Sequence, residues 1–257
     1  MIEVKNIVKS FDGKTILRDI SARFETGKTN LIIGKSGSGK TVLMKSIVGL
    51  IRPEAGEILY DGKNVLRMDA QEVKALRCEI GMLFQGSALF DSLTVLENVM
   101  FPLKMFTRQS SAEREKRARF CLERVNLIGA DRQYPSEISG GMQKRVAIAR
   151  AIALNPKYLF CDEPNSGLDP QTSILIDELV RDITREYNIT TIINTHDMSS
   201  VLGIGENIIF LDRGEKVWEG NSDGIFASTN EKLNDFVFAS NLFKAVKEYI
   251  DDRNTKK

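Results

Sequence analysis

The chain has 257 residues, of which 42% are hydrophobic and 28% are charged, and its net charge is +1. This is the composition of an ordinary globular protein, and the length is sufficient for one large α/β domain with a smaller insert. Because the charge is nearly balanced, no overall electrostatic field favours nucleic acid, and we expect no nucleic-acid partner. Three widely spaced cysteines exclude a disulfide framework and a zinc site.

Strands and helices alternate along most of the sequence. The N-terminal region, residues 2–24, predicts two or three strands that are broken at the turn pair Asp12-Gly13. Short apolar runs predict further strands at residues 29–33, 57–60, 80–84, 158–161, 190–194 and 207–211. Helical patterns occur at residues 40–50, over most of 94–128, from about Gly141, and at 170–187. This alternation predicts a mainly parallel sheet that is covered by helices on both faces.

A glycine-rich stretch joins the strand at residues 29–33 to the next helix. It fits G-x-x-x-x-G-K-[ST] at every fixed position, with Gly34, Lys35, Ser36, Gly37, Ser38, Gly39, Lys40 and Thr41. Glycines allow the backbone N–H groups to curl around an anion, and the following helix points its N-terminus at that anion. The pattern therefore predicts an ATP site in which Lys40 reaches the β- and γ-phosphates and the Thr41 hydroxyl ligates Mg²⁺.

Four polar residues follow predicted strands and are candidates for the chemistry. Asp162 and Glu163 end the apolar run at 158–161, at the edge of a parallel sheet where ligands bind. We expect Asp162 to hold Mg²⁺ and Glu163 to polarise the attacking water. The only histidine, His196, is expected to contact the γ-phosphate, and Gln85 to contact Mg²⁺ and the water. The alternatives are an ordinary surface histidine and an ordinary amide at a strand end.

A second anion site is predicted where Ser139, Gly140 and Gly141 open a helix, because N–H groups at a helix start are free. The stretch Ile138 to Val146 resembles the signature of ATP-binding cassette (ABC) ATPases. The other motifs stand in the order of that family, with the phosphate loop as Walker A, Gln85 as the Q-loop and residues 158–163 as Walker B. The residues Ser166 to Asp169 resemble its D-loop, and His196 its switch histidine.

The resemblance implies the fold and its division into parts. The expected fold is α/β, a P-loop NTPase (RecA-like) with a mainly parallel sheet, an N-terminal antiparallel β region and an inserted α-helical subdomain. The nucleotide-binding core would comprise residues 1–86 and 155–230, and the helical signature subdomain residues 87–154. Residues 231–257 would form a C-terminal helical extension, because apolar residues recur at near-helical spacing from Lys232 to Ile250.

The resemblance also implies partners and further site residues. Phe11 stands where the family stacks an aromatic ring on adenine, and Ser139 would cap the γ-phosphate bound to a second copy, giving a head-to-tail homodimer. A membrane-spanning permease would dock near the apolar segment 88–106, although most of its side chains could equally pack the insert's own core. The C-terminal extension could pack on its own domain, on the dimer mate or on an accessory subunit. Without a signal-peptide pattern or an apolar run of membrane-spanning length, we expect a cytoplasmic protein, peripheral on the cytoplasmic face of the inner membrane.

Within the family, three stretches resemble the ATP-binding subunit of Mla/Mce-type phospholipid transporters: Met82 to Phe90, Ser139 to Met142, and Asn194 to Ser200. Met142 replaces the Gln that is common in the wider family, and Asn165 stands where Thr is frequent. Three functions therefore compete, namely lipid transport, import of a small solute such as an amino acid, and a non-transport role. The short separation of Gln85 and Ser139 and the single Walker A motif disfavour the third.

Overall fold

The structure is a computed structural model that describes residues 1–239. Its strands are β1 (Ile2–Phe11), β2 (Lys14–Phe24), β3 (Thr29–Ile33), β4 (Ala55–Tyr60), β5 (Lys63–Asn64), β6 (Ile80–Leu83), β7 (Tyr158–Asp162), β8 (Thr190–Thr195), β9 (Asn207–Asp212) and β10 (Glu215–Gly220). Its α-helices are α1 (Lys40–Val48), α2 (Ala70–Cys78), α3 (Val95–Phe106), α4 (Ser111–Arg124), α5 (Gly140–Ala151), α6 (Pro170–Glu186), α7 (Met198–Ile204), α8 (Ser222–Phe226) and α9 (Glu231–Val237).

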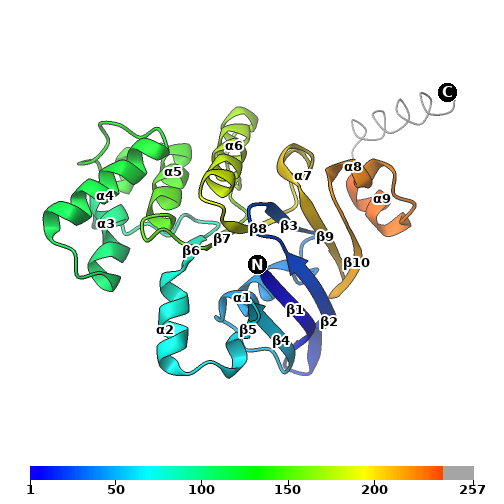
Figure 1. Cartoon of the computed structure of the whole chain (residues 1–257). Coiled ribbons are helices and arrows are strands. Elements are labelled where there is room, and N and C mark those ends of the chain that lie inside the picture. Colours follow the sequence, from blue (N-terminus) through cyan, green and yellow to red (C-terminus); the bar gives the residue numbers. More distant parts are fainter. Residues whose placement is uncertain (240–257) are drawn as a thin grey trace.

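The strands form two sheets (Figure 1). The larger has the order β10-β9-β3-β8-β7-β6, in which β9, β3, β8, β7 and β6 pair in parallel and β10 is antiparallel. The smaller is antiparallel, with the order β2-β1-β4-β5. The predicted parallel sheet and the N-terminal antiparallel region are therefore confirmed. Because β3, β7 and β8 are neighbours, the residues that follow them meet at one edge of the sheet.

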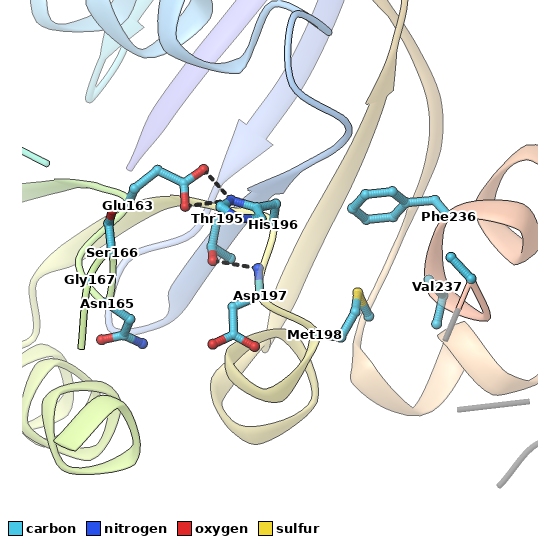
Figure 2. A pocket seen from close by; sticks show the side chains of 11 residues that line it. Glu163, Asn165, Ser166, Gly167, Thr195, His196, Asp197, Met198, Phe236 and Val237 are labelled. Carbon is cyan, nitrogen blue, oxygen red and sulfur yellow. Dashed lines mark hydrogen bonds and ion pairs between the residues drawn. The ribbon is translucent and has the colours of Figure 1, made fainter. Parts of the chain in front are cut away.

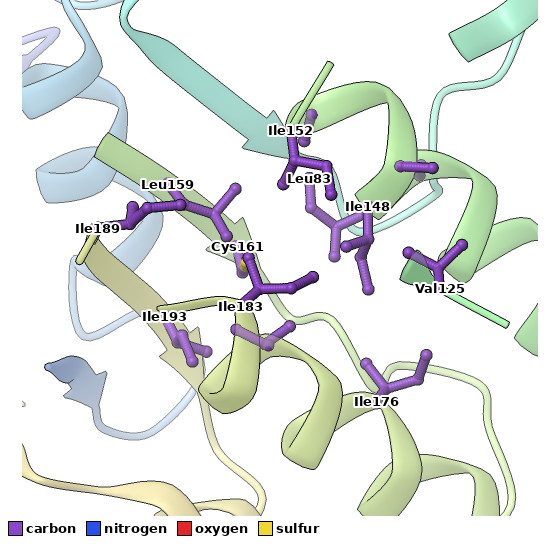
Figure 3. Close-up of a cluster of buried hydrophobic side chains, with 14 of the residues drawn as sticks. Leu83, Val125, Ile148, Ile152, Leu159, Cys161, Ile176, Ile183, Ile189 and Ile193 are labelled. Carbon is purple, nitrogen blue, oxygen red and sulfur yellow. The ribbon is translucent and has the colours of Figure 1, made fainter. Parts of the chain in front are cut away.

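Two hydrophobic cores cover the two faces of the parallel sheet. In β7, Leu159 and Cys161 face one core, whereas Tyr158 and Phe160 face the other. This double burial explains why the predicted strands are continuous apolar runs. The first core lies between the sheet and helices α5 and α6 (Figure 3). In the second, side chains of α1 pack between the two sheets, so that the helix after the phosphate loop is held from both sides.

Helices α3, α4 and α5 lie together on the β6 side of the sheet, and α8 and α9 lie beside β10 at the opposite edge (Figure 1). The three helices come between β6 and β7 in the chain, as expected of an insert, and the domain boundaries given above remain a proposal. Each of α3 and α4 begins with a capping box, from Thr94 and Ser110 respectively, which fixes where the helix starts.

Two helices differ from the sequence expectation. Helix α2 was not predicted, because it buries only Leu76, so that its apolar pattern is weak, although Asp69 and Glu72 form a capping box. Helix α9 ends at Val237, before the predicted end at Ile250, and residues 240–257 lie outside the described residues. The chain turns at Phe238, which is 6% exposed and packs against Phe226. Within residues 1–239, no helix is both long and apolar enough to cross a membrane.

Candidate active site

The phosphate loop runs from the central strand β3 into α1, and its conformation requires glycine at two positions. Gly34 and Gly39 have φ angles of 151° and 107°. A Cβ at Gly34 would lie 2.3 Å from the backbone oxygen of Leu211, which cannot move without disturbing β9. The loop therefore packs its backbone tightly against β9 and leaves its N–H groups as the concave surface expected of an anion site.

Lys40 is held over this loop. Its ammonium donates to the carbonyl oxygens of Gly34, at 2.7 Å, and Lys35, at 3.3 Å, and the residue is only 7% exposed. Burial lowers the pKa of Lys40, and the nearby carboxylates of Glu163 and Asp162 act in the opposite direction. The cation thus faces the carboxylates, and the triphosphate of ATP would supply the counter-charge that the loop itself lacks.

A cavity of about 850 Å³ opens in front of the loop. It is lined by Phe11, Lys14, Ile16, Lys35, Ser36, Gly37, Gly39, Lys40, Thr41, Val42, Gln85, Glu163, His196 and Phe236. The structure thus brings the aromatic, loop and catalytic candidates to one cavity. In the same loop, the buried hydroxyl of Ser38 has no hydrogen-bond partner among the described residues. An unpaired buried polar atom beside a glycine cradle fits a site that a phosphate group completes.

Glu163 and His196 form a direct pair. Nδ1 of His196 lies 2.9 Å from the Glu163 carboxylate, and Figure 2 shows both side chains at the edge of a second hollow, of about 510 Å³, opposite Phe236. Glu163 has a φ of 49°, a conformation that costs a non-glycine residue about 1–2 kcal/mol. Its N–H donates to the carbonyl of Asn194, at 3.0 Å, which holds the strained residue against β8. Strain of this kind gathers at functional sites.

Asp162 and Gln85 are each held by a hydrogen bond to another part of the chain. Asp162 is 9% exposed and accepts a hydrogen bond from Asn194, at 3.0 Å, so that its carboxylate is oriented from the neighbouring strand. The amide of Gln85 donates to the hydroxyl of Ser166, at 3.3 Å. Both residues are therefore placed by partners that sequence reasoning did not identify.

Ser139, Gly140, Gly141 and Asp169 do not line the cavity at Lys40. They line a separate hollow of about 400 Å³, together with Arg145 and the start of α6. Ser139 is the N-cap of α5 and its hydroxyl accepts from the N–H of Met142, at 3.2 Å. Asp169 is the N-cap of α6, and its hydrogen bond from Thr172 lowers the pKa of the carboxyl. Two helix N-termini thus face one hollow that contains no equivalent of Lys40 or Glu163.

A buried polar cluster behind the site was missed by sequence reasoning. The amide of Asn165 donates to Asp177, at 2.8 Å, and to Ser200, at 3.0 Å. These contacts connect the loop after Glu163 to α6 and α7, which accounts for an asparagine at this position. Burial raises the pKa of Asp177 to about 6. Only the departure of Asn165 from the family pattern signalled the cluster.

Lys14 and Ile16, which follow the Asp12-Gly13 turn and therefore lie near Phe11, could have been found from the hairpin.

A phosphate loop on the central strand, with carboxylates at the end of β7, defines a P-loop ATPase. A family model described as ABC transporter matches residues 17–166, and the chain belongs to that family. It is the ATP-binding subunit of an ABC transporter and an ATPase.

The relatives support this assignment over most of the chain. A probable ribonucleotide transport ATP-binding protein of Mycobacterium leprae (strain TN) is 36% identical, over 92% of this chain and 68% of that protein. A methionine import ATP-binding protein of Carboxydothermus hydrogenoformans is 41% identical, over 88% of this chain and 68% of that protein. An ATP-binding cassette solved as a dimer in a post-hydrolysis state, with ADP and Pi, is 35% identical, over 86% of this chain and 99% of that chain, with a TM-score of 0.79.

The names of these relatives bear on the transported substrate. They are a nucleotide transporter and an amino-acid importer, and neither is named for lipid. The comparisons therefore support the small-solute alternative better than the lipid interpretation, and the resemblance to Mla/Mce-type subunits is not shown.

Proposed function

We propose that this chain works as a head-to-tail homodimer beneath a membrane-spanning permease, on the cytoplasmic face of the inner membrane, and powers the import of a small solute such as an amino acid or a nucleotide. The observation that carries the dimer is the separation of two half-sites on one chain. Lys40, Glu163 and His196 share the large cavity, whereas Ser139 lines another hollow. A second copy, turned by a twofold axis, supplies the missing half to each nucleotide.

Each cavity would hold one ATP. The ring of Phe11 is 44% exposed at the mouth of the cavity and is available to stack on adenine. Lys40 and the loop N–H groups bind the phosphates, and Gly34 to Thr41 form the cradle. No group of three or more acidic, histidine or cysteine side chains in residues 1–239 could hold a metal alone. Thr41, Asp162 and Gln85 would therefore share Mg²⁺ with the phosphate oxygens, where the ion neutralises charge on the β- and γ-phosphates.

Hydrolysis would depend on the pair formed by Glu163 and His196. The carboxylate accepts a hydrogen bond from the attacking water, and His196 orients that carboxylate through the 2.9 Å contact. The imidazole is largely exposed, so that it can also reach the γ-phosphate of a bound nucleotide. Ser139, Gly140 and Gly141 of the second copy would close the site, and Asp169 would stand beside them at the dimer interface.

The permease would contact the region around α3. Four large apolar residues of this region are exposed: Phe84 at 39%, Phe90 at 42%, Met105 at 62% and Phe106 at 49%. Of the segment predicted for docking, Val99 is buried and the ring of Phe90 packs on Phe101, so that only part of it remains available. Exposed apolar residues of this kind mark interaction surfaces.

The C-terminal extension from residue 231 would contact the dimer mate or an accessory subunit. In its described part, α9 buries Leu233 and Val237 against its own domain. The ring of Phe236 stacks on Phe210, with centroids 5.2 Å apart. The rest of this segment, residues 240–257, lies outside the described residues.

Phospholipid transport is the second candidate, favoured by the three stretches that resemble Mla/Mce-type subunits. The two are distinguished by co-purifying the chain with its membrane subunit and reconstituting both in liposomes. ATP-dependent uptake of radiolabelled methionine or ribonucleotide, absent with Glu163→Gln, supports the import of a small solute. ATP-dependent transfer of a fluorescent phospholipid without solute uptake would establish the second candidate and reject the first.

A further inference from the structure

The turn that follows β6 has a strained backbone. Ser87 and Ala88 have φ angles of 61° and 48°, two consecutive non-glycine residues in the left-handed region. This conformation is unfavourable for residues other than glycine, so that the surroundings of Ser87 and Ala88 must impose it. The backbone hydrogen bonds within the turn join residues close in sequence. The N–H of Ser87 donates to the carbonyl of Phe84, and the N–H of Ala88 donates to the carbonyl of Gly86. The constraint therefore comes from outside the turn.

Two cations of α5 supply that constraint. The ammonium of Lys144 donates to the backbone carbonyl of Gln85, and Lys144 is only 4% exposed. The guanidinium of Arg150 donates to the carbonyls of Ser87 and Ala88, each at 2.7 Å. Three carbonyls of one four-residue turn are thus bound by two side chains of a single helix.

These cations are costly to desolvate, since Lys144 is buried and Arg150 is half-buried. Burial lowers the pKa of both side chains, and no carboxylate of the described residues pairs with either. An apolar side chain of similar size is often as stable as a buried charge, or more so. Core packing therefore does not explain a lysine at position 144. Hydrogen bonds to the carbonyls of the turn are what stabilise the two cations at these positions.

The same helix begins at the residue that would close the nucleotide of the second copy. Ser139 caps α5, and Lys144 lies five residues further along. On the other side of the turn, the side chain of Gln85 reaches Ser166 and lines the nucleotide cavity. A helix is stiff over this distance, so that its two ends move together.

We propose that Lys144 and Arg150 are positioning residues for ATP hydrolysis. They bind the backbone of residues 85–88 to α5, so that Gln85 is held toward the metal and the water in one nucleotide site while Ser139 on the same rigid helix is presented to the other. The inference deepens the proposed ATP site and rests on the role proposed there for Gln85. The transported substrate has no part in it.

The test compares turnover with nucleotide binding in the full-length chain. Lys144→Met removes one contact, and Arg150→Lys keeps the charge while removing one of two bonds. We expect kcat for MgATP to fall roughly tenfold to a hundredfold, as for other displaced catalytic groups. The affinity for ATP should stay within about threefold, because neither residue lines the cavity.

Arg117 provides a matched control. It donates to the carbonyls of Ile152 and Ala153, at 2.9 and 3.0 Å, just past the C-terminal end of the same helix, and does not contact the turn. Arg117→Gln should lower the melting temperature while leaving kcat within about twofold of the parent. An equal loss of kcat in this variant would mean that loosening α5 anywhere slows the enzyme, and would overturn the inference.

A double-mutant cycle then asks whether the effect passes through Gln85. In a Gln85→Ala chain, Lys144→Met and Arg150→Lys should each lower kcat by no more than about twofold, since there is no side chain left to position. The same fold-loss in both backgrounds would reject the proposal, and so would a Gln85→Ala chain with parental kcat. If Lys144→Met does not fold, Arg150→Lys carries the cycle alone. Because only ATP turnover is measured, a wrong assignment of the transported substrate cannot produce these outcomes.

Discussion

The N-termini of α1 and α5 each face a hollow, and the two sites are built very differently. At the start of α1, the backbone is folded by Gly34 and Gly39, a buried Lys40 stands over it, and Glu163 and His196 lie across a cavity of about 850 Å³. At the start of α5, Ser139 merely caps the helix beside a smaller hollow, of about 400 Å³.

The difference shows what each end can do. The first has a cation, an oriented carboxylate and a glycine cradle, so that it can both bind a triphosphate and support its hydrolysis. The second combines N–H groups with the adjacent Arg145 and the carboxylate of Asp169, which suits an anion that is already held elsewhere. This division of the two half-sites is what the proposed head-to-tail pair of chains requires.

Removing the Lys40 cation should abolish nucleotide binding at the start of α1. In Lys40→Ala we expect the affinity for ATP to fall by at least about 100-fold, because a buried charge that binds phosphate is lost. ATPase activity should disappear with it. Lys45→Ala is the matched control, since Lys45 lies on the same helix but does not line the cavity. Calorimetric titration with ATP measures the affinity of both variants. If Lys40→Ala bound ATP as tightly as the parent, the phosphate loop would not be the ATP site.

Removing only the base should separate binding from hydrolysis. Glu163→Gln keeps the size of the side chain and cannot accept the proton, so that kcat should fall about 10²- to 10⁴-fold with ATP affinity nearly unchanged. The ATP-bound dimer should accumulate, because hydrolysis no longer separates the subunits. Steady-state phosphate release and light scattering measure the two effects. A variant that hydrolyses ATP at the parental rate would show that another residue is the base.

The smallest effect concerns the cluster behind the catalytic loop. The pKa of Asp177, raised to about 6, lies above the ordinary value of about 3.9, so that the folded chain holds the proton more tightly than the unfolded chain. The stability contributed by that proton is present below pH 4 and is lost as the pH rises through 6. Asp177→Asn cannot ionise, and its free energy of unfolding relative to the parent should therefore rise by about 2–3 kcal/mol between pH 4 and pH 7.

Urea unfolding at several pH values checks this prediction. Asp182→Asn, on the same helix with a side chain that is 65% exposed, serves as the control for an Asp-to-Asn change outside the buried cluster. A difference between Asp177→Asn and the parent that stays constant from pH 4 to pH 7 would contradict the raised pKa of Asp177.

Much of the fold could be predicted because its signals are local. Apolar runs bounded by turns predicted β3, β7, β8 and β9, and their alternation with helices predicted a parallel sheet. Helix α2 was not predicted, because it depends on a capping box and buries a single leucine. The end of α9 was not predicted either, since the buried Phe238 continues the apolar pattern but turns the chain.

The candidate site also has one part that the sequence predicts and another part that it does not. Gly34 to Thr41 form a contiguous motif, so that their geometry follows from local sequence. The partners that position the site come from distant parts of the chain: Asn194 for Asp162, Ser166 for Gln85, and Asp177 for Asn165. A single sequence carries no sign of such pairings, because they depend on which strand and helix ends the topology brings together.

The central claim, that a nucleotide held by one chain is closed by Ser139 of another, can be tested by mixing two inactive variants. Lys40→Ala should not bind ATP but retains Ser139. Ser139→Arg should bind ATP, but its arginine at the start of α5 prevents it from closing the nucleotide of a second chain. We predict that each alone hydrolyses ATP very slowly and that an equimolar mixture recovers substantial activity, because a mixed dimer contains one complete site. A mixture whose ATPase activity is only the average of the two separate variants, at concentrations where the parent forms dimers, would contradict the account.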